Sequence, residues 1–317
     1  MAEERLCRRD FLRRAGIACG VAALTLEERT LLAAQKAGAA PPKEDKSAAL
    51  PMGKIGKLNV SRMICGGNLI SGYAHSRDLV YVSRLMQEYN TEKRVLDTLE
   101  LCERHGINTV LSDPWDKPRT ILNRYWKERG GKIQWIVDSR PDPKDVKPKI
   151  KMAIDAGASA IYVNGGWAER LVKQGKVDAL AKMVDFIQEN GLPAGIGGHL
   201  LDVPVACEEA GVKADFYVKT LHSRQYWSSA AQREHDNIWC RKPAETIAFM
   251  KTVTKPWIAY KTLAAGAVNP TVGFKYALQG GADFLCVGMF DFQVAQDVKI
   301  VQGLFKRGIQ RERPWRA

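Results

Sequence analysis

From about residue 60 onward, short runs of apolar and β-branched residues alternate with longer stretches whose apolar residues recur at helical spacing. This alternation is typical of strand–helix units that build a parallel sheet. Several of the short runs are almost wholly apolar, as are strands that are covered on both faces. We expect eight strands, at 62–69, 108–113, 133–139, 159–165, 193–198, 215–221, 256–263 and 283–289. Eight consecutive units close more readily into a barrel than into an open sheet, so the sequence predicts an α/β fold, a single (βα)8 TIM barrel.

The alternative fold is a doubly wound open sheet. Its dinucleotide-binding members carry a Gly-x-Gly-x-x-Gly turn directly after a strand. No predicted strand is followed by such a turn. Gly106, Gly157, Gly191 and Gly211 instead stand where a helix is expected to end before the next strand. The 317 residues accommodate one barrel, which needs roughly 250, and a leader.

The first 50 residues differ from the rest. Residues 7–14 read Cys-Arg-Arg-Asp-Phe-Leu-Arg-Arg and precede an apolar run at 15–26, which is shorter than the ~20 residues of a membrane-spanning helix. The small residues at 37–39 suit cleavage. The segment resembles a twin-arginine signal, with Cys7 where serine or threonine is usual. We predict a signal peptide at 1–39, a linker at 40–52 and the barrel at 53–317; a basic amphipathic helix is the alternative for the leader.

The leader implies passage of the folded protein through the twin-arginine export machinery into the periplasm, with no transmembrane helix in the mature chain. Residues 1–50 hold nine Lys/Arg and seven Asp/Glu, so +11 of the net charge of +13 belongs to the rest of the chain. A basic body favours anionic partners, with a merely solvated basic surface as the alternative. No helix-turn-helix or basic-aromatic motif is found, so no nucleic-acid partner is expected. The seven cysteines form no Cys-x-x-Cys pair, which gives no support to a zinc ribbon.

A parallel barrel carries its functional residues at the carboxyl ends of its strands. Two long connections, at about 71–90 and 222–243, fall at this end, and long loops in compact domains are often functional. Four of the five histidines also fall there. The polar and aromatic residues that follow the predicted strands are Asn68, Tyr73, His75, Asp113, Trp115, Asp138, Arg140, Asn164, Trp167, His199, Asp202, Lys219, His222, Tyr226, Trp227, His235, Asp236, Trp239, Lys261 and Asp291.

Two lysines stand near the ends of the neighbouring sixth and seventh strands. A lysine that is desolvated in a barrel mouth has a lowered pKa, and it then serves as a base or forms a Schiff base. Pairing with a carboxylate such as Asp215, or simple anion binding, is the alternative. The predicted catalytic residues are Lys219, His222, Asp113, His199 and Lys261.

Other side chains at this end suit binding. Aromatic rings are flat apolar platforms that fit the C–H faces of sugars, although they also pack loops against a barrel. The predicted substrate-binding residues are Asn68, Asn164, Trp115, Trp167, Tyr226 and Trp227. A divalent metal is the alternative cofactor, with imidazole and carboxylate ligands from His199, His222, His235 and Asp236. No His-Glu-x-x-His spacing accompanies them.

Three stretches resemble aldo/keto reductases, in the family's order. Residues 53–68 are similar to the family's opening, 256–266 to its seventh strand, and 287–289 with Val294 to its eighth strand and following helix. They cover both ends of the predicted barrel. The resemblance implies reduction of a carbonyl with a nicotinamide cofactor, NAD(P), by Asp, Tyr, Lys and His at the strand mouths.

The usual catalytic tetrad is not retained. Asp113 lies near the family's aspartate position, shifted by two, and no tyrosine follows at the expected distance. Asp138, with Ser139 and Arg140, replaces the lysine motif, and Asn164 replaces the histidine. Asp291 lies where the family often binds the phosphate of the cofactor, and a carboxylate there would repel it.

Three functions remain open from the sequence. The main expectation is an exported aldo/keto-reductase-like oxidoreductase acting on a carbonyl or sugar-like substrate, in which Lys219 and His222 polarise the carbonyl or relay its proton. The second is a lyase or hydrolase that uses a lysine imine or a metal at the same mouth. The third is a non-catalytic sugar-binding barrel.

The leader assignment gives the first prediction. Replacing both arginines, Arg8→Lys and Arg9→Lys, should leave the protein in the cytoplasm, because twin-arginine export reads this pair. Fractionation of cells that express the native and the double-variant chain measures the exported share. Unchanged export of the double variant would refute the assignment.

Overall fold

The computed structural model describes residues 49–73, 75, 79, 81–226, 229 and 240–317. Ala49–Ala317 form one compact unit. The predicted signal peptide and residues 40–48 of the predicted linker lie outside the described residues. In the described part of the chain, no helix combines the length and apolarity that crossing a membrane requires.

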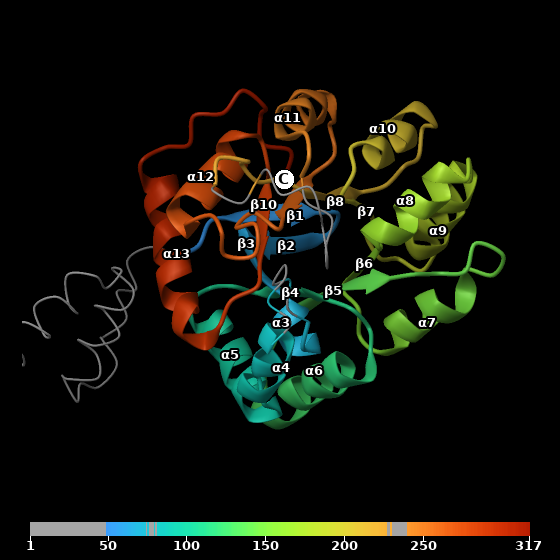
Figure 1. Ribbon diagram of the computed structural model, residues 1–317. Coiled ribbons are helices and arrows are strands. Elements are labelled where there is room, and N and C mark those ends of the chain that lie inside the picture. The colour runs from blue at the N-terminus through green and yellow to red at the C-terminus, as the bar shows by residue number, and fades with distance from the viewer. Residues whose placement is uncertain (1–48, 74, 76–78, 80, 227–228, 230–239) are drawn as a thin grey trace, which may run out of the picture. The chain divides into compact units, whose positions relative to one another are not determined.

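Eight parallel strands close into a barrel in which each strand pairs with the next along the chain and the last pairs with the first (Figure 1). The strands are β3 (Met63–Gly66), β4 (Thr109–Ser112), β5 (Gln134–Ser139), β6 (Ala160–Val163), β7 (Ala194–Gly198), β8 (Phe216–Thr220), β9 (Trp257–Tyr260) and β10 (Phe284–Val287). Each lies inside the range expected from the sequence. The (βα)8 prediction is therefore confirmed, and the open-sheet alternative is wrong.

Helices surround the barrel on its outer side. They are α3 (Asn68–Ser71), α4 (Tyr81–Tyr89), α5 (Glu92–Arg104), α6 (Asp116–Arg129), α7 (Lys147–Asp155), α8 (Gly165–Lys173), α9 (Val177–Glu189), α10 (Asp202–Glu209), α11 (Pro243–Thr252), α12 (Pro270–Gln279) and α13 (Asp291–Lys306). The four glycines expected to end helices all have φ between 68° and 94°. Glycine adopts this left-handed conformation without steric cost, which explains why the helices end there.

Apolar side chains form two clusters, one on each side of the barrel wall. An outer cluster lies between the strands and the helices, and a smaller inner cluster fills the barrel. A hairpin of β1 (Met52–Ile55) and β2 (Leu58–Ser61) precedes the first barrel strand. Ile55 and Val60 of this hairpin are fully buried within the inner cluster. The hairpin therefore closes the amino-terminal end of the barrel, and the strands' carboxyl ends form the other end, which we call the mouth.

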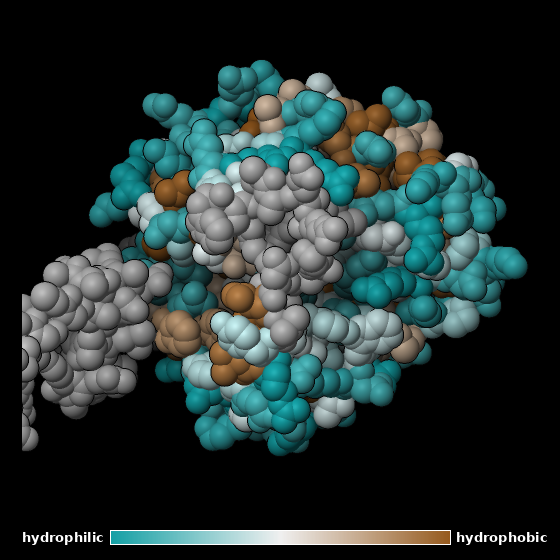
Figure 2. All heavy atoms as spheres, in the orientation of Figure 1, coloured by the Kyte–Doolittle hydropathy of each residue, from teal (hydrophilic) through white to brown (hydrophobic). Residues whose placement is uncertain are grey.

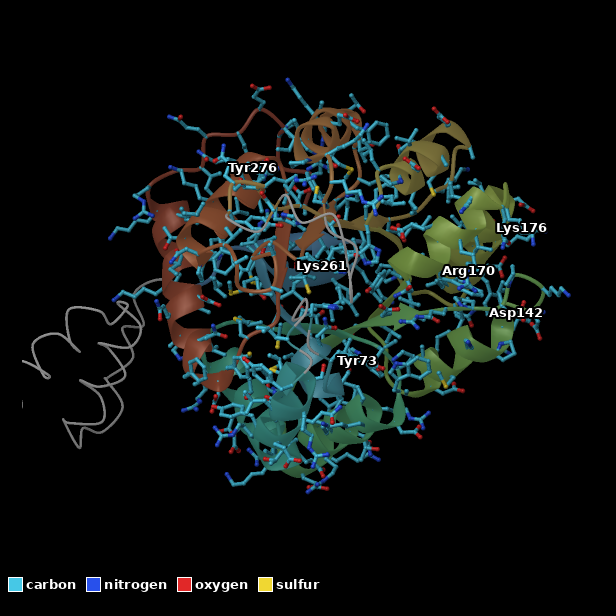
Figure 3. The ribbon with its side chains drawn as sticks, in the orientation of Figure 1. Tyr73, Asp142, Arg170, Lys176, Lys261 and Tyr276 are labelled. Atoms are coloured by element: carbon cyan, nitrogen blue, oxygen red, sulfur yellow. The ribbon has the colours of Figure 1, made fainter. Side chains whose placement is uncertain are left out.

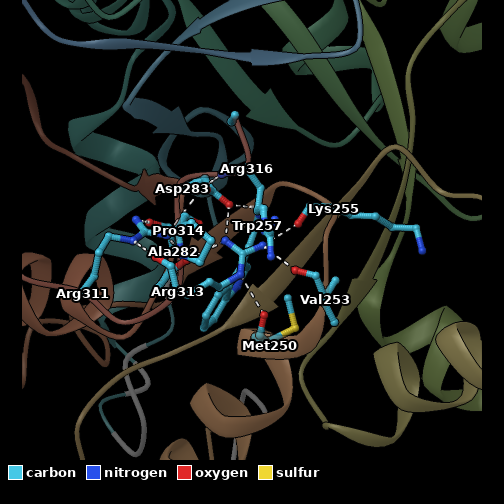
Figure 4. A network of polar contacts seen from close by, with 12 residues as sticks. Met250, Val253, Lys255, Trp257, Ala282, Asp283, Arg311, Arg313, Pro314 and Arg316 are labelled. Atoms are coloured by element: carbon cyan, nitrogen blue, oxygen red, sulfur yellow. Dashed lines mark hydrogen bonds and ion pairs between the residues drawn. The ribbon is translucent and has the colours of Figure 1, made fainter.

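The amino-terminal end of the barrel, which we call the floor, also holds a buried ion pair (Figure 4). Asp283 and Arg313 lie 2.6 Å apart, and both are almost completely buried. The Asp283 carboxylate also accepts hydrogen bonds from the backbone amides of Trp257 and Arg316, at 2.9 Å each. Arg313 uses its remaining donors on the carbonyl oxygens of Met250, Gly281, Val253 and Lys255. This network joins the segment after α13 to the loops that precede β9 and β10.

Loss of this pair should be costly. Arg313→Leu leaves the buried Asp283 carboxylate without its main partner, so the free energy of unfolding should fall by about 3–5 kcal/mol. Denaturant unfolding followed by circular dichroism measures the difference. The exposed Arg307 provides the matched control, because Arg307→Leu should change stability by no more than ~0.5 kcal/mol. Equal stability of the two variants would contradict the proposed role of the pair.

Candidate active site at the mouth of the barrel

Alternation along the strands decides which side chains face the barrel interior. Ile136 on β5 and Ala160 on β6 belong to the inner cluster. Asp138 and Tyr162 follow two residues later, so they face the interior one layer nearer the mouth, and strand pairing sets them side by side. Tyr260 at the end of β9 also packs on the inner cluster. A polar layer therefore covers the apolar interior.

Asp138 has one bonded and one unbonded carboxylate oxygen. Oδ2 accepts hydrogen bonds from the Tyr162 hydroxyl at 2.9 Å and from Asn164 Nδ2 at 2.8 Å. Oδ1 is buried and has no partner among the described residues. Burial raises the pKa of Asp138, and Asp113 adds to this, while Asn164, Tyr162 and Arg140 oppose it. Such a carboxyl group can keep its proton in a range where an ordinary aspartate is ionised.

The first turns of α8 join this carboxyl group to a histidine. Asn164 caps α8, because its Oδ1 accepts from the Trp167 amide at 3.1 Å while its Nδ2 holds Asp138. Glu169 lies further along the same helix. Its Oε1 accepts from the backbone amides of His199 at 2.5 Å and Leu200 at 2.8 Å, and lies 3.1 Å from His199 Nδ1.

His199 forms the second proton-carrying group. Burial lowers the pKa of His199, and Lys261 and Lys219 lower it further, while Glu169 opposes them. Burial alone would raise the pKa of Glu169, but the bonds from His199 and the two amides leave that pKa lowered. Because the Glu169 carboxylate can only accept, the ring proton of neutral His199 belongs on Nδ1. Nε2 then carries a lone pair and can act as a base.

Tyr260 lies beside His199, with 5.5 Å between the ring centres. Burial raises the pKa of Tyr260, with contributions from Glu169 and Asp138, so the phenol stays protonated and can donate a hydrogen bond. Gly165 leaves the necessary room. A Cβ there would lie 3.1 Å from the Tyr260 hydroxyl oxygen and 3.2 Å from His199 Cε1. A larger residue at position 165 would therefore push the two rings away from the start of α8 by a few tenths of an ångström.

Lys219 is not where the sequence analysis expected it. Its strand neighbours Tyr217 and Leu221 belong to the outer cluster, whereas Val218 belongs to the inner one, so Lys219 lies on the helix-facing side of β8. Nζ donates to the His199 carbonyl at 2.7 Å and to the Thr220 carbonyl and hydroxyl at 3.0 and 2.9 Å. Burial lowers the pKa of Lys219 to about 8, as expected. However, its three donors are all bonded, which does not favour a catalytic base or an imine at this lysine.

His222 and Asp113 are also occupied by local bonds. His222 Nδ1 lies 2.9 Å from the Ser223 carbonyl oxygen, and its Nε2 accepts from the Cys240 amide at 2.9 Å, so the ring joins two parts of the backbone. It does not relay a proton in this arrangement. Asp113 accepts from the Ser71 hydroxyl at 2.5 Å and the Trp115 amide at 3.2 Å. Asp113 therefore orders the loop after β4 and acts on Asp138 through its charge.

Lys261 does lie at the mouth. Figure 3 shows it near the centre of the barrel, whereas Arg170 and Lys176 lie at the periphery. Its Nζ is 5.4 Å from the centre of the Tyr260 ring. Lys261 has φ of 59°, and Ala264 and Ala265 in the same loop also have positive φ. Non-glycine residues adopt this conformation at an energetic cost, and such strain tends to occur at functional sites.

The predicted substrate-binding residues separate into two groups. Asn164 belongs to the site through Asp138, whereas Trp167 donates from Nε1 to the Pro141 carbonyl at 2.7 Å and packs a loop. Asn68 and Trp115 are exposed. Figure 2 shows that hydrophilic side chains predominate on the face of the molecule that it presents. Tyr226 lies beside His222, with 6.0 Å between ring centres. Trp227 lies outside the described residues.

The metal alternative gains no support from the described residues, which contain no group of three or more His, Cys, Asp or Glu able to hold an ion. His199 is bonded to Glu169 and His222 to backbone groups, as described above. His235 and Asp236 lie outside the described residues, so their part in this alternative stays a prediction.

Three residues of the site escaped the sequence analysis. Tyr162 and Tyr260 stand at inward positions two residues after apolar interior residues, and this spacing was the available signal. Glu169 lies inside a helix rather than after a strand, and no motif marks it.

Comparison with known proteins bears on the fold. No protein-family model matches the sequence, and a search of curated proteins finds no match. Among solved structures, one named as an aldo-keto reductase from Pseudomonas aeruginosa is similar, with a TM-score of 0.58 at 14% identity over 82% of this chain and 98% of its own. This likeness concerns the fold alone, which in both proteins is a TIM barrel. The aldo-keto reductase AKR11C1 from Bacillus halodurans, in its holo form, is similar over 80% of this chain and 91% of its own, with a TM-score of 0.57 at 11% identity.

The expected phosphate position of a nicotinamide cofactor can be tested at the start of α13. Asp291 in the first turn accepts from the Tyr89 hydroxyl at 2.7 Å and from Arg94 at 2.8 Å. The amide of Phe290 donates to the side chain of Gln293 at 3.0 Å. The Asp291 carboxylate repels an anion at this helix start, and the Phe290 amide is already bonded to Gln293 and is not available to a phosphate. The residues here do not fit the phosphate of NAD(P).

The pairing of Glu169 with His199 gives a prediction. Glu169→Gln keeps the side chain's size but removes the negative charge, so the pKa of His199 should fall below its native value. Histidine ring resonances followed by NMR across a pH series measure it. Glu189→Gln, at an exposed position, should leave the pKa of His199 unchanged. A His199 pKa that rises in Glu169→Gln would show that the carboxylate does not stabilise the imidazolium.

Proposed function

We propose that this barrel is an acid–base enzyme that moves a proton at a carbonyl or hydroxyl group of a small, sugar-like substrate. The observation that carries the proposal is the buried Asp138 Oδ1, which has no partner among the described residues, at a mouth that also holds the Glu169–His199 pair. A carboxyl group that retains its proton and an imidazole that stays neutral form a matched acid and base.

Each residue has a definite part in this chemistry. Asp138 donates its Oδ1 proton to the substrate oxygen, while Tyr162 and Asn164 stabilise the carboxylate that remains, through Oδ2. His199 accepts a proton on Nε2, and the Glu169 carboxylate stabilises the imidazolium that forms. Asn164, predicted as a substrate-binding residue, therefore acts by positioning the acid.

The proposed substrate class follows from the polarity of the site. Tyr260 and Lys261 supply hydrogen-bond donors near the mouth, and Asp138 and His199 supply exchangeable protons. Hydroxyl and carbonyl groups match these partners. The fold is also that of proteins named aldo-keto reductases, and reduction of a carbonyl needs the same proton delivery to oxygen.

Export through the twin-arginine route into the periplasm remains part of the proposal. It is supported by the leader sequence alone and is independent of the site.

Asp138→Asn tests the proposal, because the amide keeps the shape but cannot deliver the proton. Incubation of the protein with a panel of aldoses, ketoses and small hydroxyketones, followed by ¹H NMR, measures turnover. The native chain should convert at least one member, and Asp138→Asn should be slower by about 10²-fold or more. Asp142→Asn, exposed on the loop after β5, is the control and should keep native rates. Equal turnover in Asp138→Asn and the native chain would overturn the assignment.

The pH profile provides a second test. Activity should fall at low pH as His199 gains a proton, and at high pH as Asp138 loses one. The lowered His199 pKa moves the acid limb to lower pH and the raised Asp138 pKa moves the alkaline limb to higher pH, so both shifts enlarge the pH range in which His199 is neutral while Asp138 keeps its proton. Tyr162→Phe removes a donor that stabilises the Asp138 carboxylate. The alkaline limb of this variant should therefore move to higher pH; movement to lower pH would contradict the role given to Asp138.

A further inference from the structure

We infer that the reaction is the isomerisation of an α-hydroxycarbonyl compound, an aldose–ketose interconversion in which His199 and Asp138 shuttle protons and no hydride donor takes part. The inference rests on the proposed function and names its reaction class. It is carried by three features of the mouth as the described residues form it: a base whose Nε2 carries a lone pair, an acid whose Oδ1 has no partner among these residues, and three helix starts whose aspartates disfavour a phosphate.

The first feature is a complete acid–base couple. A carbonyl reduction by hydride needs one proton donor, for the oxygen. This mouth holds two proton-carrying groups, and each has its own support: Tyr162 and Asn164 for Asp138, and Glu169 for His199. Isomerisation uses both, since one group must act at carbon and the other at oxygen.

The second feature is the arrangement around α8. The cap residue Asn164 holds the acid, and Glu169 in the same helix holds the base. Gly165 lies between them and has no side chain, so the Tyr260 hydroxyl and the His199 ring both lie close to it. A planar enediol is an uncharged or singly charged intermediate rich in hydroxyl groups, and the Tyr260 hydroxyl is a donor suited to it.

The third feature is the negative charge at three of the helix starts around the mouth, whereas α8 and α12 have no acidic residue in their first turns. A dinucleotide in a parallel α/β barrel needs backbone amides for its phosphates, and helix N-termini usually supply them. Asp116 of α6, Asp202 of α10 and Asp291 of α13 lie in the first turns of their helices. Each carboxylate favours its own helix start and repels a phosphate there.

The chemistry balances with these two residues alone. His199 Nε2 removes the proton from the hydroxyl-bearing carbon, and that C–H electron pair forms the carbon–carbon double bond of an enediol. The carbonyl oxygen takes the Asp138 Oδ1 proton as its π electrons move onto it. In the second half, the other hydroxyl group returns a proton to Asp138 and becomes the new carbonyl group. The double-bond electrons take the proton from His199 at the former carbonyl carbon, so one carbon is oxidised, its neighbour is reduced, and both side chains are restored.

Solvent isotope exchange tests the inference. The native chain is incubated in ²H₂O, without added cofactor, with glyceraldehyde, dihydroxyacetone, glucose, fructose, xylose and xylulose. Because His199 exchanges its proton with solvent, the isomerised product should carry deuterium on carbon, seen by ¹H NMR and as a mass increase of one unit. Asp138→Asn and His199→Gln should each slow incorporation by about 10²-fold or more, and Asp142→Asn should not.

The possible outcomes distinguish failure of the isomerisation inference from failure of the proposed acid–base function. Conversion that requires NADH or NADPH, consumes it in equal amount and leaves no deuterium on carbon would overturn isomerisation while acid–base action at a carbonyl stands. Failure of the native chain to change any sugar, with or without NADH and NADPH, would overturn both. Tyr162→Phe removes only one hydrogen bond, so we expect this variant to fold. It therefore tests the proposal even if the other variants do not fold. Its deuterium incorporation should extend to higher pH, and an unchanged pH limit would count against Asp138 as the acid.

Discussion

The start of α8 is the constraint on which the rest of the site depends. Asn164 uses its two amide atoms for different tasks: the oxygen caps the helix and the nitrogen holds the carboxylate of Asp138. Glu169, on the same helix, fixes the backbone after β7 and the ring of His199. One helix therefore holds both the acid and the base that we propose.

The fold could be predicted from the sequence, whereas the site could be predicted only in part. Alternating periodicity is a local property, and each strand begins and ends within the stretch that the periodicity indicates. Which face of a strand a side chain occupies is harder to infer, because a shift of one residue reverses it. Lys219 shows this: it lies near the end of β8 as expected, but on the outer face. Glu169 reaches the mouth from a helix, so a search of strand ends could not find it.

The mouth of this barrel carries an acidic residue, Asp138, where the resemblance to aldo/keto reductases implies a lysine. A lysine beside a tyrosine stabilises the phenolate and lowers the tyrosine pKa. Here Asp138 stands in the lysine position, and it contributes to raising the pKa values of both Tyr162 and Tyr260. Burial is the larger cause of both shifts, and the tyrosines stay protonated as hydrogen-bond donors. In the function that we propose, the carboxyl group carries the proton. The proposal is compatible with a common barrel, because function resides in the site rather than in the fold.

The buried pair at the floor of the barrel affects the order in which the chain can fold. A ribosome makes Asp283 before Arg313. Until the arginine arrives, the carboxylate lacks the partner that offsets its desolvation, and it is more stable in water than beneath β9 and β10. We therefore expect water to leave the surroundings of Asp283 only late in synthesis, after Arg313 has been added. A nascent chain that stops after β10 should keep this end of the barrel hydrated.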